Sequence, residues 1–318
     1  MGSNLSSLSP YVLSNFGEKG EWIFICIQVS MPIGTLFAGW ISDKTKKIRI
    51  FSILGISLLF PTQYFLFSFP HNWITTAILA GFQRFLLSAN YQWVIIGAIE
   101  EKGENRFSKI RSSGTFGFLI IQFILYLLTT IELPFSISDP SETGKLGSYF
   151  YIFCFPFCFK LPRKRISHLE YRFKDALNLL KDSNLRMFFI YAFIFYSAYQ
   201  VTDNYLGRYF QIYIGLDSVY LSWFIAVILE IPFLFLVSKI SLRYGIFSLF
   251  YLSLIFGFLR YSLLSVSVVG INKNLLLSFQ AFHSILFAGF YMGTILWLRK
   301  VSPPHLYGSL YGLYSIFA

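Results

Sequence analysis

Five ionisable side chains lie inside long apolar runs of this 318-residue sequence. A charge at the centre of a bilayer costs on the order of 2.5–3.5 kcal/mol even on lenient insertion scales, so such a residue faces a protein interior or a water-filled cavity. A histidine among carboxylates and guanidiniums can also titrate near neutral pH. These residues are the first candidates for binding a polar solute or moving a proton: Arg84, Asp203, Glu230, Arg260 and His283.

The apolar runs have the length of membrane-spanning helices. Hydrophobic residues make up 55% of the chain and charged residues 13%, whereas a soluble domain carries about 25% charged residues. One crossing needs about 20 apolar helical residues. The sequence therefore predicts an all-α membrane protein with full spans at Trp22–Ile41, Ile50–Phe69, Trp73–Ile99, Ser112–Ile131, Met187–Leu206, Val219–Ile240, Ile246–Val269 and Leu275–Leu298, and a shorter ninth span at Leu146–Leu161.

Shorter apolar segments remain at the two ends of the sequence. Leu5–Phe16 is too short and too polar to cross alone, and Leu306–Ala318 stops within an apolar run. The chain is therefore expected to lack most of a first helix and the last helices of the set.

Lys and Arg residues lie mainly on alternate connections between the spans. Such an excess marks the cytoplasmic side of a membrane protein. The net charge of +11 thus indicates a multi-pass protein of the inner cell membrane, with basic loops cytoplasmic, rather than a nucleic-acid partner. The opposite connections hold only Lys19, Lys145, Arg208 and Lys273.

Four of the five intramembrane ionisable residues fall at a similar depth. With a rise of 1.5 Å per residue from the outer end of each span, Arg84 and Glu230 lie at roughly 16 Å, Arg260 at roughly 13 Å and His283 at roughly 12 Å. Asp203 is shallower, at roughly 5 Å. The four converge near the midplane, where helical transporters bind substrate.

Enzyme and cofactor chemistry is not expected. Neither the number nor the spacing of Cys26, Cys154 and Cys158 indicates a disulfide framework or a zinc site, so no metal is predicted. A membrane-embedded acyl- or glycosyltransferase would need acid–base groups at the membrane surface. The loop acids are instead interspersed with Lys and Arg, as solvated loop charge is: Glu100, Glu101, Glu104 and Asp175.

The connection after the first full span carries a recognisable motif. It reads Gly39-Trp-Ile-Ser-Asp43-Lys44-Thr-Lys46-Lys47, in which Gly39 allows close helix approach and Asp43 can meet a helix end. The segment resembles the signature loop of the major facilitator superfamily, with Lys46 in place of the usual second glycine. The resemblance implies a conformational gating loop of Gly39, Asp43, Lys44 and Lys47. The alternative is an ordinary positive-inside loop.

A second stretch, Phe107–Phe118, resembles the fifth helix of the lactose permease branch of that superfamily, which also holds nucleoside and phenylpropionate permeases. Lys109 stands where that branch has its first arginine. The resemblance implies that Arg111 reaches the substrate and that Phe118 stacks on it. Topology signalling and helix packing are the alternative explanation of these residues.

The same resemblance extends to the ionisable residues. It implies that Glu230, in Leu-Glu-Ile-Pro, binds substrate, as Arg84 also could from its depth. It assigns Arg260, His283 and Asp203 to proton coupling, although Leu286 occupies the position of a coupling carboxylate. Packing pairs such as Glu230 with Arg260 are the structural alternative. Further residues that could line a cavity are Tyr199, Tyr205 and Tyr291.

The resemblance implies a major facilitator fold with two helical bundles around a central cavity. We expect an N-terminal bundle at 1–160, a cytoplasmic loop at 161–186, whose amphipathic stretch lies along the membrane, and a C-terminal bundle at 187–318. The expected function is proton-coupled symport of a sugar, nucleoside or aromatic acid by a monomer whose partners are the solute, protons and lipids. The alternatives are an uncoupled facilitator and a truncated, non-transporting product.

Overall fold

The computed structural model describes residues 2–68, 72–102, 104–130, 139–162, 173–267, 273–303 and 306–316, and these contain helices and no strand. The contacts between residues divide the chain into two compact units. Unit 1 comprises Met1–Ser6, Lys102–Ser138 and Gly207–Lys300. Unit 2 comprises Ser7–Glu101, Asp139–Leu206 and Val301–Ala318. The prediction of an all-α protein is confirmed.

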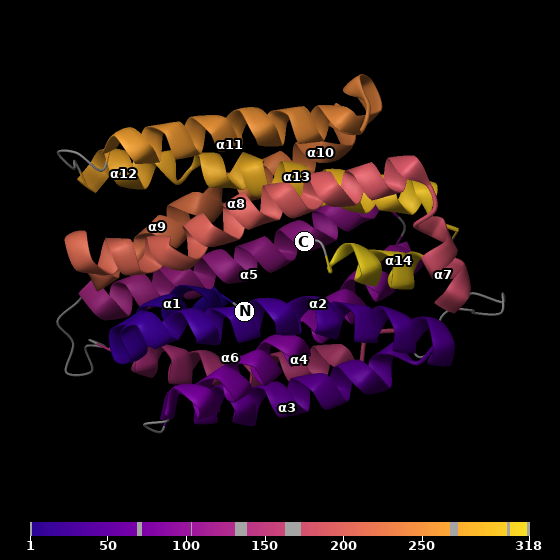
Figure 1. Cartoon of the computed structure of the whole chain (residues 1–318). Helices are drawn as coiled ribbons and strands as arrows, with labels where there is room; N and C mark the ends of the chain where they lie inside the picture. The colour runs from indigo at the N-terminus through magenta and orange to yellow at the C-terminus, as the bar shows by residue number, and fades with distance from the viewer. Residues whose placement is uncertain are drawn as a thin grey trace. The chain divides into compact units, whose positions relative to one another are not determined.

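Each unit is a packed set of helices, labelled in Figure 1. Those wholly or mainly in unit 1 are α5 (Glu104–Thr130), α9 (Leu216–Ile228), α10 (Glu230–Tyr244), α11 (Phe247–Ser267), α12 (Lys273–Phe279) and α13 (Phe282–Val301). Those wholly or mainly in unit 2 are α1 (Gly2–Phe16), the 3₁₀ turn η1 (Gly17–Lys19), α2 (Gly20–Thr45), α3 (Ile48–Ser68), α4 (Trp73–Lys102), α6 (Pro140–Cys158), α7 (Phe173–Leu179), α8 (Ser183–Tyr213) and α14 (Tyr307–Tyr314).

The helices expose large apolar side chains that water would not solvate well. Leu242 is 83% exposed, Phe258 73% and Phe153 71%. Such a surface is suited to lipid. Six stretches of the described chain are long and apolar enough to cross a membrane: Ser6–Thr45, Ile48–Ser68, Lys109–Thr130, Leu216–Tyr244, Phe247–Val266 and Lys273–Val301. The protein is therefore a multi-pass membrane protein.

The other three predicted spans form long helices that are more polar. Helix α4 contains Gln83, Asn90 and Gln92, all of them buried. Polar side chains turned inward lower the hydropathy of a helix without placing those groups in lipid. The sequence therefore predicted α4, α6 and α8 from the length of their apolar runs. These three helices contain more polar residues than the six apolar stretches.

The N-terminal segment is a longer helix than its sequence suggested. Helix α1 continues through η1 into α2, and Leu8, Tyr11 and Val12 of α1 form a buried cluster with residues of α2. The Tyr11 hydroxyl donates to the carbonyl of Leu66 on α3. Packing against two neighbouring helices stabilises a segment that is too polar to be recognised as a span by itself.

In unit 2, buried amides join α3, α4 and α6. Gln63 Oε1 accepts from Gln83 Nε2 at 3.1 Å and from the Tyr151 hydroxyl at 3.0 Å, while Gln63 Nε2 donates to the Gly144 carbonyl at 2.9 Å. Helices α3 and α6 lie side by side, and a Cβ on Gly144 would meet the Phe67 ring at 2.5 Å. Gln83 Nε2 also donates to the Tyr151 hydroxyl at 3.5 Å, so Gln63 is the centre of a buried network that joins the three helices.

In unit 1, small residues bring α13 close to α11. A Cβ on Gly289 would lie 2.9 Å from the Leu249 carbonyl oxygen, and a Cβ on Gly293 would lie 3.0 Å from the Phe250 ring. The glycine pair therefore allows the two helices to approach closely.

Two helix breaks in unit 1 lie beside the candidate residues. Pro232 has no backbone N–H, so the carbonyl of Ile228 loses its intrahelical donor and α9 ends there, one residue before α10 begins at Glu230. A second break, at Gln280 and Ala281, separates α12 from α13. Irregular backbone within a membrane protein is tolerated where it is buried in protein or lines a polar site.

The boundaries predicted at 1–160, 161–186 and 187–318 stay a prediction. Helix α5 packs with α9 and α10 in unit 1, while α14 packs with α2 in unit 2. The compact units are thus built from helices of both sequence halves. Of the predicted connecting loop, residues 163–172 lie outside the described residues, and α7 covers part of its amphipathic stretch.

Replacing Gln63 by leucine should destabilise the protein. The change removes the acceptor of the Tyr151 hydroxyl and the 3.1 Å acceptor of Gln83 Nε2, so these two buried groups keep only their mutual contact of 3.5 Å. A buried group that loses its hydrogen bond costs about 1–3 kcal/mol. Thermal unfolding in detergent would show a clear drop in Tm. The control is Ser57→Ala on the same helix, an exposed hydroxyl bonded to its own helix backbone, which should change little. Equal Tm values would contradict the role of Gln63.

Candidate functional site

An ion pair between α5 and α10 is the centre of the candidate site in unit 1. Arg111 Nη2 lies 3.2 Å from Glu230 Oε1. The side chains are 17% and 4% exposed, respectively. A guanidinium beside a buried carboxylate offsets part of the cost of removing that group from water. The structure therefore brings together the two residues that the sequence proposed for substrate binding.

Thr115 closes this pair into a triangle of hydrogen bonds. Arg111 Nη1 donates to the Thr115 hydroxyl at 2.9 Å, and that hydroxyl donates to Glu230 Oε1 at 2.8 Å. Thr115 follows Arg111 by four residues, so both project from one face of α5. A single Glu230 oxygen thus has two donors from α5, and both could be exchanged for hydroxyl groups of a ligand.

Glu230 owes its position to the break before α10. It is the first residue of this helix, where the backbone N–H groups give the helix end a partial positive charge. A carboxylate is stabilised at such an end. The Leu-Glu-Ile-Pro sequence thus places an acid directly at the helix start that its own proline creates.

Aromatic rings on α13 connect this ion pair with His283. The Arg111 guanidinium lies over the Tyr291 ring, 5.4 Å from its centroid. Tyr291 stacks on Phe287 with centroids 5.6 Å apart, and Phe287 stacks on His283 at 5.8 Å. The four-residue spacing of the three rings places them in one row along α13.

Trp223 of α9 contacts this row of rings edge-on. Its ring meets His283 in a T-shaped contact at 5.6 Å and Phe118 in a second at 6.3 Å. Trp223 therefore contacts both Phe118 and His283, and the predicted stacking of Phe118 on a substrate stays a prediction. Trp223, Thr115 and Phe287 were missed by the sequence analysis, although four-residue spacing from Arg111 and His283 marks two of them.

Arg260 on α11 lies in the same unit and is 1% exposed. Its Nη2 donates to Gln280 Oε1 at 3.0 Å, and the guanidinium lies 5.5 Å from the Tyr261 ring centroid. The alternative expectation of a Glu230–Arg260 packing pair differs from the observed ion pair, in which Arg111 is the partner of Glu230. His283 and Glu230 are each 3% exposed, so all three predicted residues are buried.

Leu286 is part of the packing between α13 and α11. A Cβ on Gly257 would lie 2.8 Å from a methyl group of Leu286, and the Ser253 hydroxyl donates to the Leu286 carbonyl at 2.6 Å. The position that the resemblance assigns to a carboxylate therefore holds a buried apolar side chain in close contact with a glycine.

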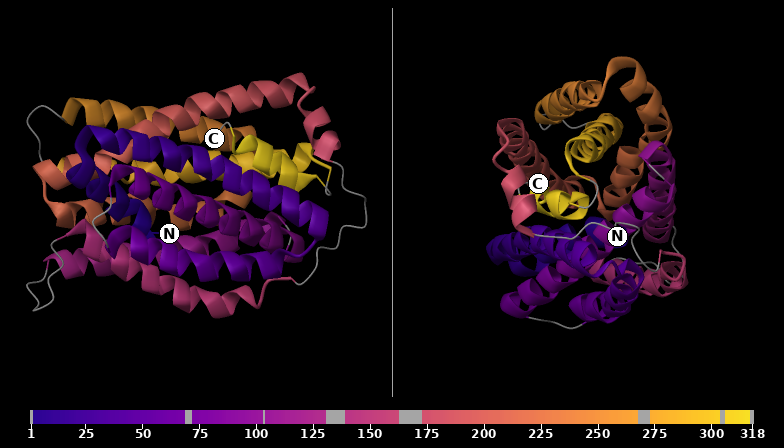
Figure 2. Two further views of the ribbon diagram at one scale, coloured as in Figure 1. Left: turned by 60° about the horizontal axis from the view of Figure 1, so that its bottom comes forward. Right: turned by 90° about the vertical axis from the view of Figure 1, so that its right-hand side faces the viewer.

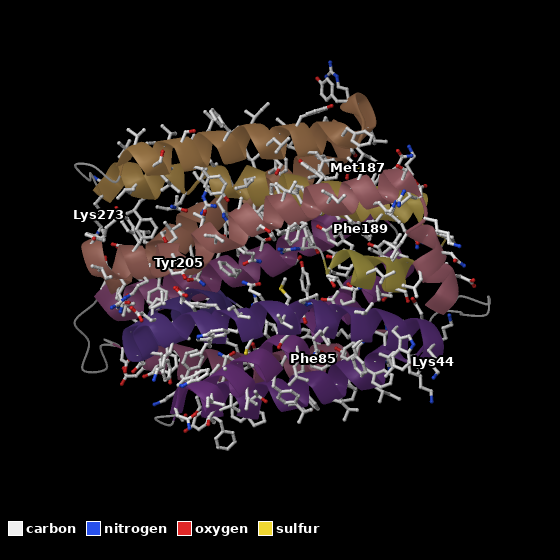
Figure 3. The ribbon with its side chains drawn as sticks, viewed as in Figure 1. Lys44, Phe85, Met187, Phe189, Tyr205 and Lys273 are labelled. Atoms are coloured by element: carbon white, nitrogen blue, oxygen red, sulfur yellow. The ribbon has the colours of Figure 1, made fainter. Side chains whose placement is uncertain are left out.

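Arg84 and Asp203 belong to unit 2. Arg84 on α4 has Tyr151 and Tyr199 as electrostatic neighbours. Asp203 is half-buried on α8. On the same helix Tyr205, labelled in Figure 3, contacts the Phe24 ring of α2 at 6.4 Å. The predicted site residues are thus divided between the two units, Arg111, Phe118, Glu230, Arg260 and His283 being in unit 1.

The signature loop caps the first turn of α14. Asp43 Oδ2 accepts from the Ser309 backbone N–H at 2.8 Å and from its hydroxyl at 2.6 Å. Glycines permit this approach, since a Cβ on Gly39 would collide with the Gly308 carbonyl oxygen. The expectation that Asp43 meets a helix end is confirmed, and α14 runs against α2 in both views of Figure 2.

The basic residues of this loop differ in their roles. Lys44, labelled in Figure 3, lies over the Trp40 ring at 5.1 Å, and Lys47 is exposed. Lys46 adopts a left-handed conformation with φ 61° as the residue after α2. This conformation suits glycine and costs other residues roughly 1–2 kcal/mol. The left-handed backbone thus explains why the resembling family usually has glycine at this position. Lysine adopts the same backbone here with a loss of stability.

Comparison with known proteins agrees with this fold. A family model described as the MFS_1 like family matches residues 3–318. The search of curated protein sequences gives no match.

Solved transporter structures share the fold at low sequence identity. The nucleoside transporter NupG has a TM-score of 0.74 and 17% identity, over 99% of this chain and 82% of that one. The E. coli xylose transporter XylE, in a partially occluded inward-open conformation, has 0.68 and 12%, over 99% and 85%. A bacterial homologue of the iron transporter ferroportin has 0.59 and 14%, over 99% and 87%.

Replacing Lys46 by glycine should stabilise the protein by roughly 1 kcal/mol, because the left-handed backbone no longer carries a side-chain penalty. Thermal unfolding would show a raised Tm. Lys47→Gly is the matched control, since Lys47 loses the same charge in the next position without a positive φ. A Tm of Lys46→Gly at or below that of the control would contradict the strain.

Proposed function

Because the chain belongs to the MFS_1 like family and has the fold of major facilitator transporters, we propose that it is a secondary active transporter that takes up a small organic solute. Alternating access would occur between an N-terminal bundle at 1–160 and a C-terminal bundle at 187–318. It would act as a monomer in the inner cell membrane with its basic loops cytoplasmic. It would catalyse no chemical reaction.

The buried triangle of Arg111, Thr115 and Glu230 is the observation that carries this proposal. A solute hydroxyl could donate to Glu230 in place of Thr115, while a solute oxygen accepts from Arg111. The exchange keeps Glu230 and Arg111 hydrogen-bonded with and without solute, so binding does not leave an unpaired charge. Phe118 and Trp223 supply apolar ring surface beside the polar groups. Arg84 is proposed as a further substrate contact from unit 2.

A solute with both hydroxyl groups and an apolar face fits this combination. Sugars, nucleosides and aromatic acids all share these features. The similar structures are those of a nucleoside transporter, a xylose transporter and a bacterial homologue of the iron transporter ferroportin. In the described part of this chain no group of three or more His, Cys, Asp or Glu residues could hold a metal ion, which favours an organic solute.

We propose further that protons drive the uptake. His283 can change charge near neutral pH, and Arg260 and Asp203 are the candidate groups that respond to it. The rival is a facilitator without ion coupling. The packed Leu286, in the position where the permease branch has a carboxylate, favours that rival.

The gating loop would stabilise one conformation. Asp43 holds α14 through the Ser309 backbone, and this bond must break if the two helices separate during transport. Gly39 allows the close approach, while Lys44 and Lys47 keep the loop on the cytoplasmic side.

Glu230→Gln should abolish at least nine-tenths of solute uptake by cells or proteoliposomes, because an amide cannot accept from both donors with full charge. The matched control is Asp217→Asn, which removes the partner of Lys273 in the same unit at a half-exposed site and should leave uptake close to normal. A growth and uptake screen across sugars, nucleosides and aromatic acids supplies the solute. Full activity of Glu230→Gln at normal expression would sink the proposed site.

Proton coupling is measured separately, with uptake into proteoliposomes at equal and unequal pH. An inward proton gradient should allow accumulation above the external concentration, and an uncoupler should remove it. Equilibration without accumulation would identify the uncoupled facilitator and leave the solute site intact.

A further inference from the structure

Arg84 projects from the protein side of α4. Residues three and four positions away lie on the same side of a helix, and those around Arg84 are all buried: Ala80, Gly81, Leu87 and Ser88. On the other side of α4, Ile78 and Phe82 are exposed, as side chains in contact with lipid are. Arg84 itself is half-buried. The accessible part of its side chain therefore lies on the protein side of the helix, where a polar solute rather than lipid would meet it.

The described chain supplies no negative charge to this arginine. No described carboxylate lies within ion-pair distance of Arg84, and its Nε is buried without a hydrogen-bond partner. Of the acids in unit 2, Asp203 alone falls within a predicted span, at a depth of roughly 5 Å against roughly 16 Å for Arg84. A charged side chain at such a depth is costly unless it is paired or faces a polar site.

The two electrostatic neighbours of Arg84 are phenols, Tyr151 of α6 and Tyr199 of α8. A phenol is uncharged near neutral pH. The Tyr151 hydroxyl already donates to Gln63 Oε1 at 3.0 Å, so its proton is in use. Neither ring balances the charge of the guanidinium, and a bound anion would do so.

Rings on α8 lie beside this arginine in the same unit. Phe195 stacks on Tyr199 with the ring planes 10° apart and the centroids 6.3 Å apart, and Tyr196 meets Tyr199 edge-on at 6.1 Å. Phe195 and Tyr196 are half-buried, so they keep accessible ring surface. A guanidinium next to such rings suits a solute that joins an anionic group to an apolar body.

The number of positive charges distinguishes between anionic groups. Arg84 is the one basic residue of unit 2 near the middle of a predicted span. A carboxylate carries a single negative charge and pairs with a guanidinium through two parallel hydrogen bonds. A phosphate monoester carries nearly two negative charges at neutral pH, so one charge would stay unbalanced in the interior. A single arginine therefore favours a carboxylate.

We propose that Arg84 binds the carboxylate of the transported solute and that Tyr199, Phe195 and Tyr196 contact its apolar body. This inference rests on the proposed function and narrows the solute to an organic acid. Arg84 would then determine specificity, because a solute without a negative charge leaves the guanidinium uncompensated in the interior.

The full chain, purified in detergent, is unfolded thermally with benzoate, phenylacetate or 3-phenylpropionate, each compared with its own amide at equal ionic strength. Binding to the folded state stabilises it by RT ln(1 + [L]/Kd), so a saturating acid should raise Tm by several degrees, on the order of 5 °C, and its amide should not. Acetate, which has the charge without the ring, should give a smaller rise. If no acid raises Tm above its amide, the proposal is wrong.

Phenyl phosphate tests the other anionic group on the same apolar body. A smaller rise in Tm than with the carboxylates is expected, since one arginine balances one charge. A larger rise would identify a phosphate-bearing solute and overturn the assignment of a carboxylate.

Arg84→Gln should lose the difference between acid and amide, and Arg84→Lys should keep part of it. The matched control is Arg186→Gln, which removes the same charge at an exposed position of α8 in unit 2 and should keep the full shift. An undiminished shift in Arg84→Gln would contradict the proposal. If this variant does not fold, the comparison of acids with amides in the natural protein still decides.

Uptake separates this inference from the proposed function. Uptake of a neutral sugar or nucleoside that Glu230→Gln abolishes and Arg84→Gln leaves unchanged would overturn the carboxylate site, while the transporter assignment stands. Stabilisation by an acid together with no uptake of any solute would contradict the transport function alone.

Discussion

Polar side chains within an apolar surrounding must find partners inside the protein, and this constraint organises both units. Asp43 meets the first turn of α14, Glu230 meets Arg111 and Thr115, and Gln63 meets groups from two helices. Each pairing holds one helix against another at a defined position along the helix axes. The interior of a helical membrane protein gains little from hydrophobic burial between helices, because lipid is equally apolar. Hydrogen bonds and close glycine contacts therefore decide which helices pack.

Helix breaks supply the places where a polar site can exist. Pro232 interrupts the ladder of hydrogen bonds and starts α10 at Glu230, so the acid sits on the positive end of its helix. The break at Gln280 places another amide beside Arg260. In a continuous helix all backbone groups would be hydrogen-bonded within the helix, and only side chains could form a polar site. The unit is thus least regular where its chemistry is concentrated.

At Lys46 and Leu286 the sequence differs from the family that it resembles, and the structure shows what each difference does. Lys46 keeps the left-handed backbone of the glycine it replaces, so the loop retains its shape and loses some stability. Leu286 does not keep the chemistry of the carboxylate it replaces, because it fills the space over Gly257. One substitution therefore preserves the contact of Asp43 with α14, while the other places an apolar side chain where the resembling permeases have a carboxylate.

Hydropathy determined the helical class and the approximate spans, the loop sequence indicated that Asp43 could meet a helix end, and the family resemblance selected Arg111 and Glu230 as candidates. These follow from local rules, because a buried charge or a small residue has few uses in a membrane helix. Only the tertiary structure decided that Arg111 rather than Arg260 pairs with Glu230, that Thr115 and Trp223 join the site, and that Gln280 keeps a buried donor without a partner. Such choices depend on how helices distant in sequence are rotated against each other, and rotation is set by packing contacts that no single helix contains.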